Sequence, residues 1–444
     1  MRHRFLFTLW PFTGHLLPQM SIAIALRERG HEVAFYSGEA VRAIVEGEGF
    51  ELFGFEHLDQ ERGFAAMRAV EERETRKRPG SRRLPAIFRD WLVETIPDQV
   101  ADLRAVLSRW RPDAIATDLS LWAPIVVLWE AERIPVALSS TFMGPLIPGP
   151  DAPAFGFGLR PPRSFLGRAG SRTLTGLVEL AGTSLRRRVN EIRAEYRLPA
   201  LGEPVNRWTG RLPLYLVGNV RELDYNRHDL PGTVHYVGNC IWYPDPADTA
   251  GWLERIPAER PWVHVTESTL SYGDPFLLRT AIEALADEPL ELIVTTGEHR
   301  EADSLGPRAQ ASNVHVARWL SHGELLPRCA AAVTVGGKAT ILAAMEAGVP
   351  VVVVPTTWDK PDNARRVTEA GAGLRLSPRR LTADALRAGV RRVLDDPRHR
   401  VAARRIAGRL AAAPGPPFAA ELLEALASGQ TARPGMALVQ GGER

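Results

Sequence analysis

The residues that point most directly to chemistry are two glycines and a lysine, Gly336-Gly337-Lys338, between a short apolar run and a helical pattern. Glycines at such a junction let backbone N–H groups approach an anion, and the helix dipole adds roughly half a positive charge there. Phosphate is the usual anion in this position. A tight turn without a ligand is the alternative, because glycine adopts backbone angles that other residues avoid.

Other known phosphate, nucleotide and metal motifs do not fit this segment. A Walker P-loop, G-x-x-x-x-G-K-[ST], would need glycine at Ala332 and serine or threonine at Ala339. No G-x-G-x-x-G fingerprint follows an expected strand, and zinc-ligand spacings are absent. These patterns argue against a Walker NTPase, a nicotinamide dehydrogenase and a zinc site.

A second candidate centre combines a histidine near the N-terminus with an acid that follows a later apolar run. His15 comes after Phe5–Leu9, and Asp118 comes after Asp113–Thr117. Histidine titrates near neutral pH and can remove a hydroxyl proton, while a neighbouring carboxylate fixes its tautomer and stabilises the imidazolium. Taken separately, His15 is also typical of a loop histidine and Asp118 of a helix cap.

The elements that must position these residues alternate between strand and helix. In the first half, strands are expected at Phe5–Leu9, Glu32–Tyr36, Glu51–Gly54, Asp113–Thr117 and Val136–Ser139, with helices at Leu16–Arg29, Ala40–Glu48, Ala86–Trp110 and Trp122–Glu132. In the second half, strands are expected at Trp262–Thr266, Leu290–Thr295, Val314–Ala317, Ala331–Val335 and Val351–Val354, with helices at Pro275–Ala286, Ala339–Ala347 and Asn363–Ala370. Strands separated by helices pair in parallel, so the pattern predicts two doubly wound α/β domains.

The proline-rich stretch Asn239–Pro261 marks the expected linker between the domains. It separates an N-terminal domain, 1–238, from a C-terminal domain, 262–428, whose last helices are expected to pack back on the first domain. The small, polar tail, 429–444, is expected to be disordered.

Two segments depart from the regular pattern of the first domain: the charged, helical Gln60–Arg89 and the proline- and glycine-rich Phe142–Pro162. Both are consistent with exposed loops, and Phe142–Pro162 also with an apolar acceptor wall. The arginines within Gln60–Arg89 are consistent with a solvated helix face. They also leave open binding to an acidic acceptor or to a membrane surface.

Composition limits the remaining possibilities. The chain has 444 residues, 45% of them hydrophobic and 24% charged, which is typical of a folded protein of more than one domain. No run approaches the roughly 18 apolar residues of a membrane span. Pro11 and Gly14 interrupt the N-terminal apolar run, so it is not expected to be a signal peptide. The two cysteines, Cys240 and Cys329, favour a reducing cytoplasm. We expect a cytoplasmic monomer or weak homodimer that has no nucleic-acid partner.

The segment around Gly336 and Gly337 resembles the donor signature of nucleotide-sugar-dependent glycosyltransferases of the GT-B fold. This family includes plant small-molecule glucosyltransferases and bacterial macrolide and antibiotic glycosyltransferases. The family pattern, T-H-G-G-x-x-S/T, G-V-P, D/E-Q and N-A, is met by Thr334, Gly336-Gly337, Thr340, Gly348-Val349-Pro350, Asp359 and Asn363-Ala364. Upstream, Trp319 and Leu320 resemble the family's base-binding loop, and Ser268-Thr269 its Gly-Ser/Thr pair. The resemblance implies that these residues bind a nucleotide sugar, Asp359 and Lys360 holding sugar hydroxyls.

The departures from the family pattern concern charge. Val335 stands where the family has a phosphate-binding histidine, Lys360 where it often has glutamine, and Ala343 where plant-type enzymes have a ribose-binding glutamate. Lysine is otherwise rare here, with Lys77 the only other one. Our hypothesis is that Lys338 supplies the positive charge of the missing imidazole. A solvated lysine at a helix start is the alternative.

The N-terminal segment resembles the G-H-x-x-P and R-G-H-x-V signature of the same family, at Gly14-His15 and Arg29-Gly30-His31. The resemblance implies that His15 is the general base and Asp118 its partner, whereas His31 lies in a turn and is structural. The acceptor-binding candidates are aromatic side chains around these elements: Phe12, Trp122, Phe142, Phe155 and Phe157. As a group they indicate an apolar acceptor, such as a polyketide, terpenoid or flavonoid ring system.

The resemblance covers about residues 1–425 and implies two Rossmann-like domains that face a cleft. It implies inverting, metal-independent hexose transfer from a UDP- or dTDP-sugar, with no cofactor beyond this co-substrate. An oxygen nucleophile is expected, and carbon or nitrogen remains open. Two rival functions also remain: a catalytically silent partner protein, which Val335 and Lys360 favour, and a nucleotide-sugar epimerase, which would lack an acceptor site.

Overall fold

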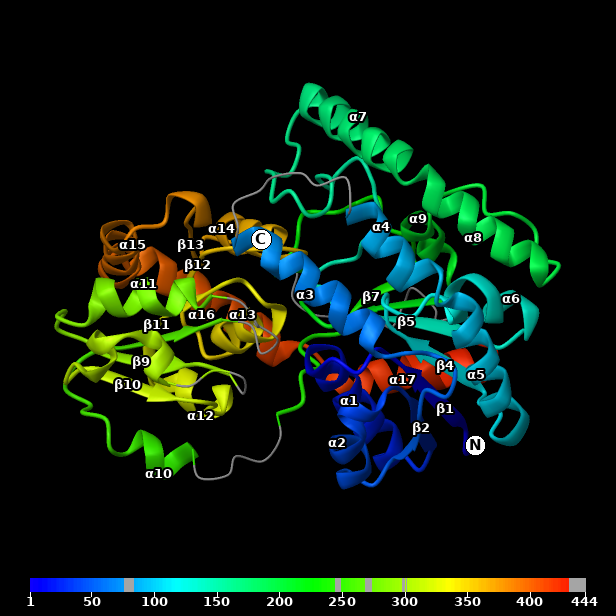
Figure 1. Cartoon of the computed structure of the whole chain (residues 1–444), viewed down its shortest axis with the longest axis horizontal. Helices are drawn as coiled ribbons and strands as arrows, with labels where there is room; N and C mark the ends of the chain where they lie inside the picture. The colour runs from blue at the N-terminus through cyan, green and yellow to red at the C-terminus, as the bar shows by residue number, and fades with distance from the viewer. Residues whose placement is uncertain (76–83, 244–248, 268–273, 298–299, 301, 431–444) are drawn as a thin grey trace, which may run out of the picture.

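The computed structural model describes residues 1–75, 84–243, 249–267, 274–297, 300 and 302–430. These residues form two α/β domains side by side, each built around one parallel sheet with helices on both faces (Figure 1). The prediction of two doubly wound sheets is therefore confirmed.

The N-terminal domain contains a seven-stranded sheet in the order β3-β2-β1-β4-β5-β6-β7. Its strands are β1 (Arg4–Thr8), β2 (Glu32–Tyr36), β3 (Glu51–Phe53), β4 (Ala114–Thr117), β5 (Val136–Ser140), β6 (Leu214–Val217) and β7 (Val234–Tyr236). The central strands β1, β4 and β5 are buried almost throughout, as expected for a parallel sheet covered on both faces. Because β1 pairs directly with β4, the loops that follow these two strands lie next to each other at the carboxyl edge.

The helices of this domain surround that sheet. They are α1 (Thr13–Glu28), α2 (Arg42–Gly47), α3 (Glu61–Thr75), α4 (Leu84–Phe88), α5 (Ile96–Arg109), α6 (Trp129–Ala131), α7 (Phe165–Ala181), α8 (Thr183–Glu195) and α9 (Val205–Trp208), with π-helical turns η2 (Arg89–Val93) and η3 (Pro124–Leu128). The single helix expected over Ala86–Trp110 is thus divided. Pro97, in the first turn of α5, lacks an N–H group and favours a new helix start there.

The C-terminal domain contains a six-stranded sheet in the order β10-β9-β8-β11-β12-β13. Its strands are β8 (Trp262–Thr266), β9 (Glu291–Thr295), β10 (Val314–Ala317), β11 (Cys329–Thr334), β12 (Val351–Val353) and β13 (Gly373–Arg375). The helices are α10 (Thr249–Leu253), α11 (Phe276–Leu285), α12 (His322–Leu325), α13 (Lys338–Glu346), α14 (Lys360–Glu369), α15 (Ala383–Asp395), α16 (Pro397–Ala412) and α17 (Gly415–Ala427). The short strands β6, β7 and β13 were not predicted, because three or four residues show too little periodicity.

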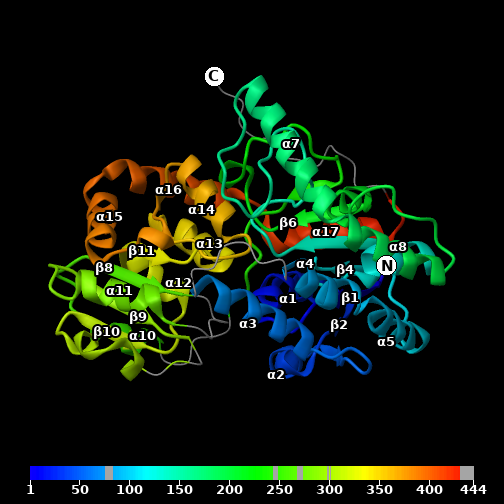
Figure 2. The ribbon, with the colours of Figure 1, turned by 45° about the horizontal axis from the view of Figure 1, so that its top comes forward.

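The last helix leaves its own domain. α17 lies along the N-terminal domain beside α1 (Figure 2) and buries Ala419 and Leu423 in the core there. The carboxylate of Glu424 accepts hydrogen bonds from Arg29 Nε at 2.6 Å and lies 2.6 Å from His31 Nε2, which gives His31 the structural place expected of it. These contacts hold the pKa of Glu424 down at about 2, chiefly through the Arg29 hydrogen bond.

No helix within the described ranges is both long enough and apolar enough to span a membrane.

Candidate active site between the domains

The catalytic candidates His15 and Asp118 are in direct contact. His15 Nδ1 lies 2.6 Å from Asp118 Oδ2, the imidazole 25% exposed and the carboxylate fully buried. His15 lies in the first turn of α1, directly after β1, and Asp118 directly follows the paired strand β4. Because Asp118 accepts at Nδ1, that nitrogen carries the proton and Nε2 keeps its lone pair for a substrate.

Two neighbours hold this pair in place, and sequence reasoning missed one of them. Ser120 donates its backbone N–H to Asp118 Oδ1 at 2.7 Å, and its hydroxyl bonds the same oxygen. The Asp-x-Ser spacing is a turn signal that could have revealed this contact. Phe12, a predicted acceptor residue, is only 1% exposed and packs edge-on against His15 at 5.2 Å between ring centroids. In this structure Phe12 is therefore buried against the candidate base His15, with almost no surface open to an acceptor.

The glycine turn of the donor segment has the geometry of an anion site. Gly336 has φ +99°, and a Cβ there would lie 3.0 Å from Val353 Cγ1 and 3.2 Å from the Lys360 carbonyl oxygen. Gly337 is the N-cap of α13 and has no side chain to satisfy the first N–H groups of that helix. Val335 is buried, 3% exposed, so it adds no polar group to the turn.

Asn363 joins the two halves of the donor segment. Its side-chain Nδ2 donates to the Gly336 carbonyl oxygen at 3.0 Å and to Asp359 Oδ2 at 2.7 Å. Burial raises the pKa of the Asp359 carboxyl, and this hydrogen bond works against that rise. The family motif marked Asn363, and the structure gives it a physical role: it keeps the glycine turn and the sugar-binding candidate Asp359 at a fixed separation.

The ammonium group of Lys338 reaches across to the other domain. Lys338 is 8% exposed, and its Nζ donates to the Ser140 carbonyl oxygen at the end of β5, 3.0 Å away. Burial lowers the pKa of Lys338 from its ordinary 10.5 to about 8. The side chain is therefore not a solvated lysine, and its ammonium group donates a hydrogen bond to the N-terminal domain.

The other donor candidates differ in exposure. Trp319, after β10, is 42% exposed and open to a stacking ligand, whereas Leu320 is buried in the core. Thr340 and Lys360 are also buried. Ser268 and Thr269 lie outside the described residues. Among the residues that are described, no group of three potential metal ligands comes together.

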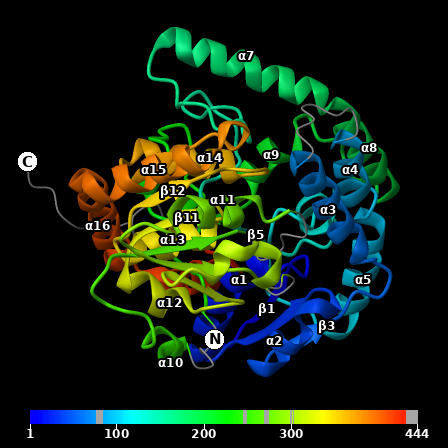
Figure 3. The same cartoon turned by 60° about the vertical axis from the view of Figure 1, so that its left-hand side comes forward.

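The segment Phe142–Pro162, predicted as an acceptor wall, is hydrogen-bonded to the C-terminal domain. The N–H groups of Gly156 and Gly158 donate to the two carboxylate oxygens of Asp362, at 2.6 and 2.8 Å. Between them Phe157 is 51% exposed, while Phe155, 41% exposed, packs edge-on against Phe142 at 5.5 Å. The segment therefore follows the interdomain boundary close to α14, as Figure 3 shows.

The predicted acceptor residue Trp122 makes a local contact. It is partly buried and donates its indole N–H to the Leu119 carbonyl oxygen at 2.9 Å. Trp122 packs against the core of the N-terminal domain.

A tryptophan that the sequence did not single out joins the two centres. Trp358, next to Asp359, has φ +63°, which is strained for a non-glycine residue. Its ring packs edge-on against Trp91 at 6.0 Å, and Trp91 packs against Phe12 at the same distance. The indole N–H groups of Trp91 and Trp358 are buried, and neither has a hydrogen-bond partner among the described residues. Strain and unpaired donors at one place are typical of a ligand site.

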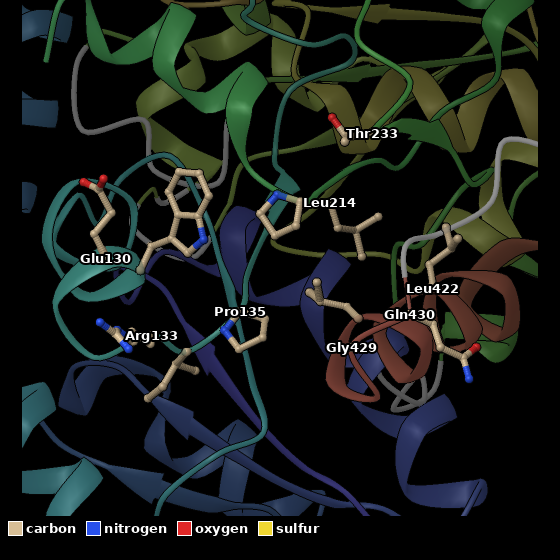
Figure 4. A pocket seen from close by; sticks show the side chains of 12 residues that line it. Glu130, Arg133, Pro135, Leu214, Thr233, Leu422, Gly429 and Gln430 are labelled. Carbon is tan, nitrogen blue, oxygen red and sulfur yellow. The ribbon is translucent and has the colours of Figure 1, made fainter.

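A cavity lies away from the predicted site residues. It measures about 610 Å³ and lies at the amino ends of β5 and β6, near Pro135 and Leu214 (Figure 4). No predicted site residue lines it. Doubly wound sheets bind ligands at the carboxyl edge, where His15 and Asp118 lie, so the cavity has no part in the chemistry.

Comparison with known proteins extends over both domains. Residues 279–426 match the family model of the erythromycin biosynthesis protein CIII-like C-terminal domain. The chain is 35% identical to 4'-demethylrebeccamycin synthase of Lentzea aerocolonigenes, over 96% of this chain and 100% of that protein. It is 29% identical to demethyllactenocin mycarosyltransferase of Streptomyces fradiae, over 95% of this chain and 86% of the relative. Among solved structures, the glycosyltransferase of kitacinnamycin superposes with a TM-score of 0.74 at 23% identity, over 96% of this chain and 99% of that one.

Proposed function

This chain belongs to the GT-B glycosyltransferases of natural-product biosynthesis, and from that premise we propose that it is an inverting hexosyltransferase. The donor is a UDP- or dTDP-hexose, and the acceptor is a hydroxyl group on a small, largely apolar molecule. The observation that carries this proposal is the pairing of the His15–Asp118 dyad, whose carboxylate is buried, with a glycine turn hydrogen-bonded through Asn363 to Asp359. The two are linked through Trp358, Trp91 and Phe12.

In the proposed reaction, His15 Nε2 takes the proton of the acceptor hydroxyl. The acceptor oxygen attacks the anomeric carbon of the sugar, and the bond from that carbon to the diphosphate oxygen breaks on the opposite face. The configuration at the anomeric carbon is therefore inverted. Asp118 stabilises the imidazolium that forms, because its buried carboxylate stays hydrogen-bonded to Nδ1.

In this proposal the leaving diphosphate binds at the N-terminus of α13. The uncapped N–H groups after Gly337 and the helix dipole supply positive potential where negative charge develops. We assign the sugar hydroxyls to Asp359, and base stacking to the exposed face of Trp319. Such a site needs no cofactor beyond the donor.

The acceptor class follows from the aromatic side chains next to the proposed base. Trp91 and Trp358 carry unpaired N–H donors beside it, and Phe157 adds exposed apolar surface. Two relatives carry names of natural-product enzymes, a 4'-demethylrebeccamycin synthase and a demethyllactenocin mycarosyltransferase, which supports an acceptor of that kind.

Because Cys240 and Cys329 are buried free thiols, we place the enzyme in a reducing cytoplasm.

The experiment that tests this function offers UDP-glucose and dTDP-glucose with a panel of flat aromatic alcohols. We expect release of nucleoside diphosphate and a product heavier by one hexosyl group, with the β-anomer formed from an α-linked donor. Product masses and the anomeric proton coupling in NMR spectra provide the readout. A retained anomer would reject inversion, and nucleotide binding without any product would favour the silent-partner alternative.

The role of Lys338 can be tested separately through pH. Its pKa of about 8 means that the ammonium is present below pH 8 and is lost as the pH rises through that value. If Lys338 turns from Ser140 to the diphosphate, nucleoside diphosphate affinity should fall about tenfold between pH 7 and pH 9, roughly 1.4 kcal/mol. Titration calorimetry at both pH values measures this fall.

Substitution of Lys338 by methionine should remove this pH dependence, whereas Lys360→Met, next to the sugar-binding acid, should keep it. Equal affinity at the two pH values would show that Lys338 serves only the contact between the domains.

A further inference from the structure

Helix α7 presents its apolar side chains to solvent. No residue of α7 is buried, and four large apolar side chains are strongly exposed: Phe165 at 79%, Leu166 at 80%, Leu177 at 58% and Leu180 at 69%. Figure 1 shows α7 along the outer edge of the N-terminal domain, away from both sheets. An apolar surface of this kind on a folded protein indicates a binding face.

The polar side of α7 is the side that contacts its own domain. Arg168 pairs with Asp151 at 3.3 Å, and Ser171 donates to the Ala152 carbonyl oxygen at 2.8 Å. Further along the helix, Glu179 pairs with Arg207 at 2.5 Å. The helix is therefore oriented with its polar face inward, and the exposed apolar face is a fixed feature of the fold.

The exposed face forms one continuous seam. Residues at helical intervals of three and four share a face, and here they are Leu166, Ala169, Gly170, Thr173, Gly176, Leu177 and Leu180. All of them are exposed, and none is charged. The side chains in the middle of the seam are small, and those at its two ends are large.

The seam is symmetric about Thr173. Leu166 and Leu180 lie at equal distances on either side of it, as do Gly170 and Gly176. A two-fold axis at Thr173 would therefore place Leu166 of one copy opposite Leu180 of the other. The glycines would meet in the middle, where small residues allow two helices to approach closely.

From this symmetry we infer that α7 binds a second copy of this chain through an antiparallel α7–α7 contact. The 17-residue helix is about 25 Å long, and such a stripe offers on the order of 500 Å² per copy, against about 800 Å² per partner in a standard interface. The dimer is therefore weak and depends on concentration.

A membrane surface is the other class of partner that an apolar helix face suits, and two features of α7 disfavour it. Interfacial helices direct their basic side chains toward lipid headgroups, whereas Arg168 pairs with Asp151 of its own domain. The centre of the seam, around Gly170 and Gly176, also has little apolar area to insert into a bilayer.

Cysteine cross-linking tests the contact and its register together. In the proposed dimer Thr173 meets its own copy, so Thr173→Cys should give a disulfide-linked dimer under mild oxidation on a non-reducing gel. Phe165→Cys is the matched control, because the two copies of Phe165 lie about 24 Å apart along an antiparallel pair, beyond the reach of a disulfide. Cys240 and Cys329 are buried and give no background.

Sedimentation velocity over a concentration series supplies the second measurement. The wild-type chain should shift from monomer toward dimer as its concentration rises, and Leu166→Glu with Leu180→Glu should remove that shift while circular dichroism stays the same. The inference is overturned by equal cross-linking at positions 173 and 165, by no cross-link at either, by a wild-type monomer at every concentration, or by flotation with phosphatidylserine vesicles in place of dimerisation.

Discussion

Substitution of His15 by alanine should lower kcat by about a thousandfold, within the range of 10²–10⁴ typical of a lost general base. The acceptor hydroxyl then keeps its proton, because Asp118, fully buried beneath the imidazole, cannot reach it. Affinity for nucleoside diphosphate should stay the same, because the donor turn belongs to the other domain. Initial rates at saturating donor, together with calorimetric titration of the nucleotide, measure both quantities.

The partner variant, Asp118→Asn, separates tautomer control from proton removal. Its amide can donate a hydrogen bond to Nδ1 and so favours the tautomer whose Nε2 carries the proton, which is useless as a base. We expect a loss comparable to that of His15→Ala, with no further loss in the double variant, because the two residues act as a unit. If His15→Ala kept more than a tenth of the wild-type rate, the base would have to be sought elsewhere.

The second large effect is expected at the glycine turn, where Gly336→Ala should abolish measurable donor binding and lower the melting temperature. At φ +99° an alanine is strained, and its Cβ would lie 3.0 Å from Val353 and 3.2 Å from the Lys360 carbonyl oxygen. Relief of these contacts moves the turn away from Asn363 and Asp359, at a cost of about 1–3 kcal/mol. Thermal unfolding and nucleotide titration report the two consequences.

The neighbouring Gly337→Ala is the matched control. Gly337 has φ −62°, and no atom of the described residues lies within 4 Å of the position that a Cβ would take. Its melting temperature should therefore match that of the wild type, while a methyl group at the start of α13 weakens nucleotide binding only if phosphate occupies that place. A Gly337→Ala variant that binds nucleotide normally would contradict the anion site, and a Gly336→Ala variant of normal stability would contradict the strain.

The two sheets and the positions of the two candidate centres could be predicted from the sequence, because local signals determine them. The buried strands are short apolar runs, as at Trp262–Thr266, and crossover helices between them permit only parallel pairing. The glycine at position 336 indicates a turn, because residues with a side chain rarely adopt a backbone φ of +99°. His15 and Asp118 come together because each directly follows one of two strands that pair.

What the tertiary structure alone decided are contacts between segments far apart in the chain. No local pattern shows that Trp358 meets Trp91, or that Lys338 donates to Ser140 across the domain boundary. The helix pattern of α7 likewise does not reveal that its polar face is turned inward. Periodicity tells which residues share a face, but which face is covered depends on the neighbours that folding brings there. The sequence by itself therefore determined the glycine turn and the adjacency of His15 and Asp118, and the packing of the two domains determined what lies between and around them.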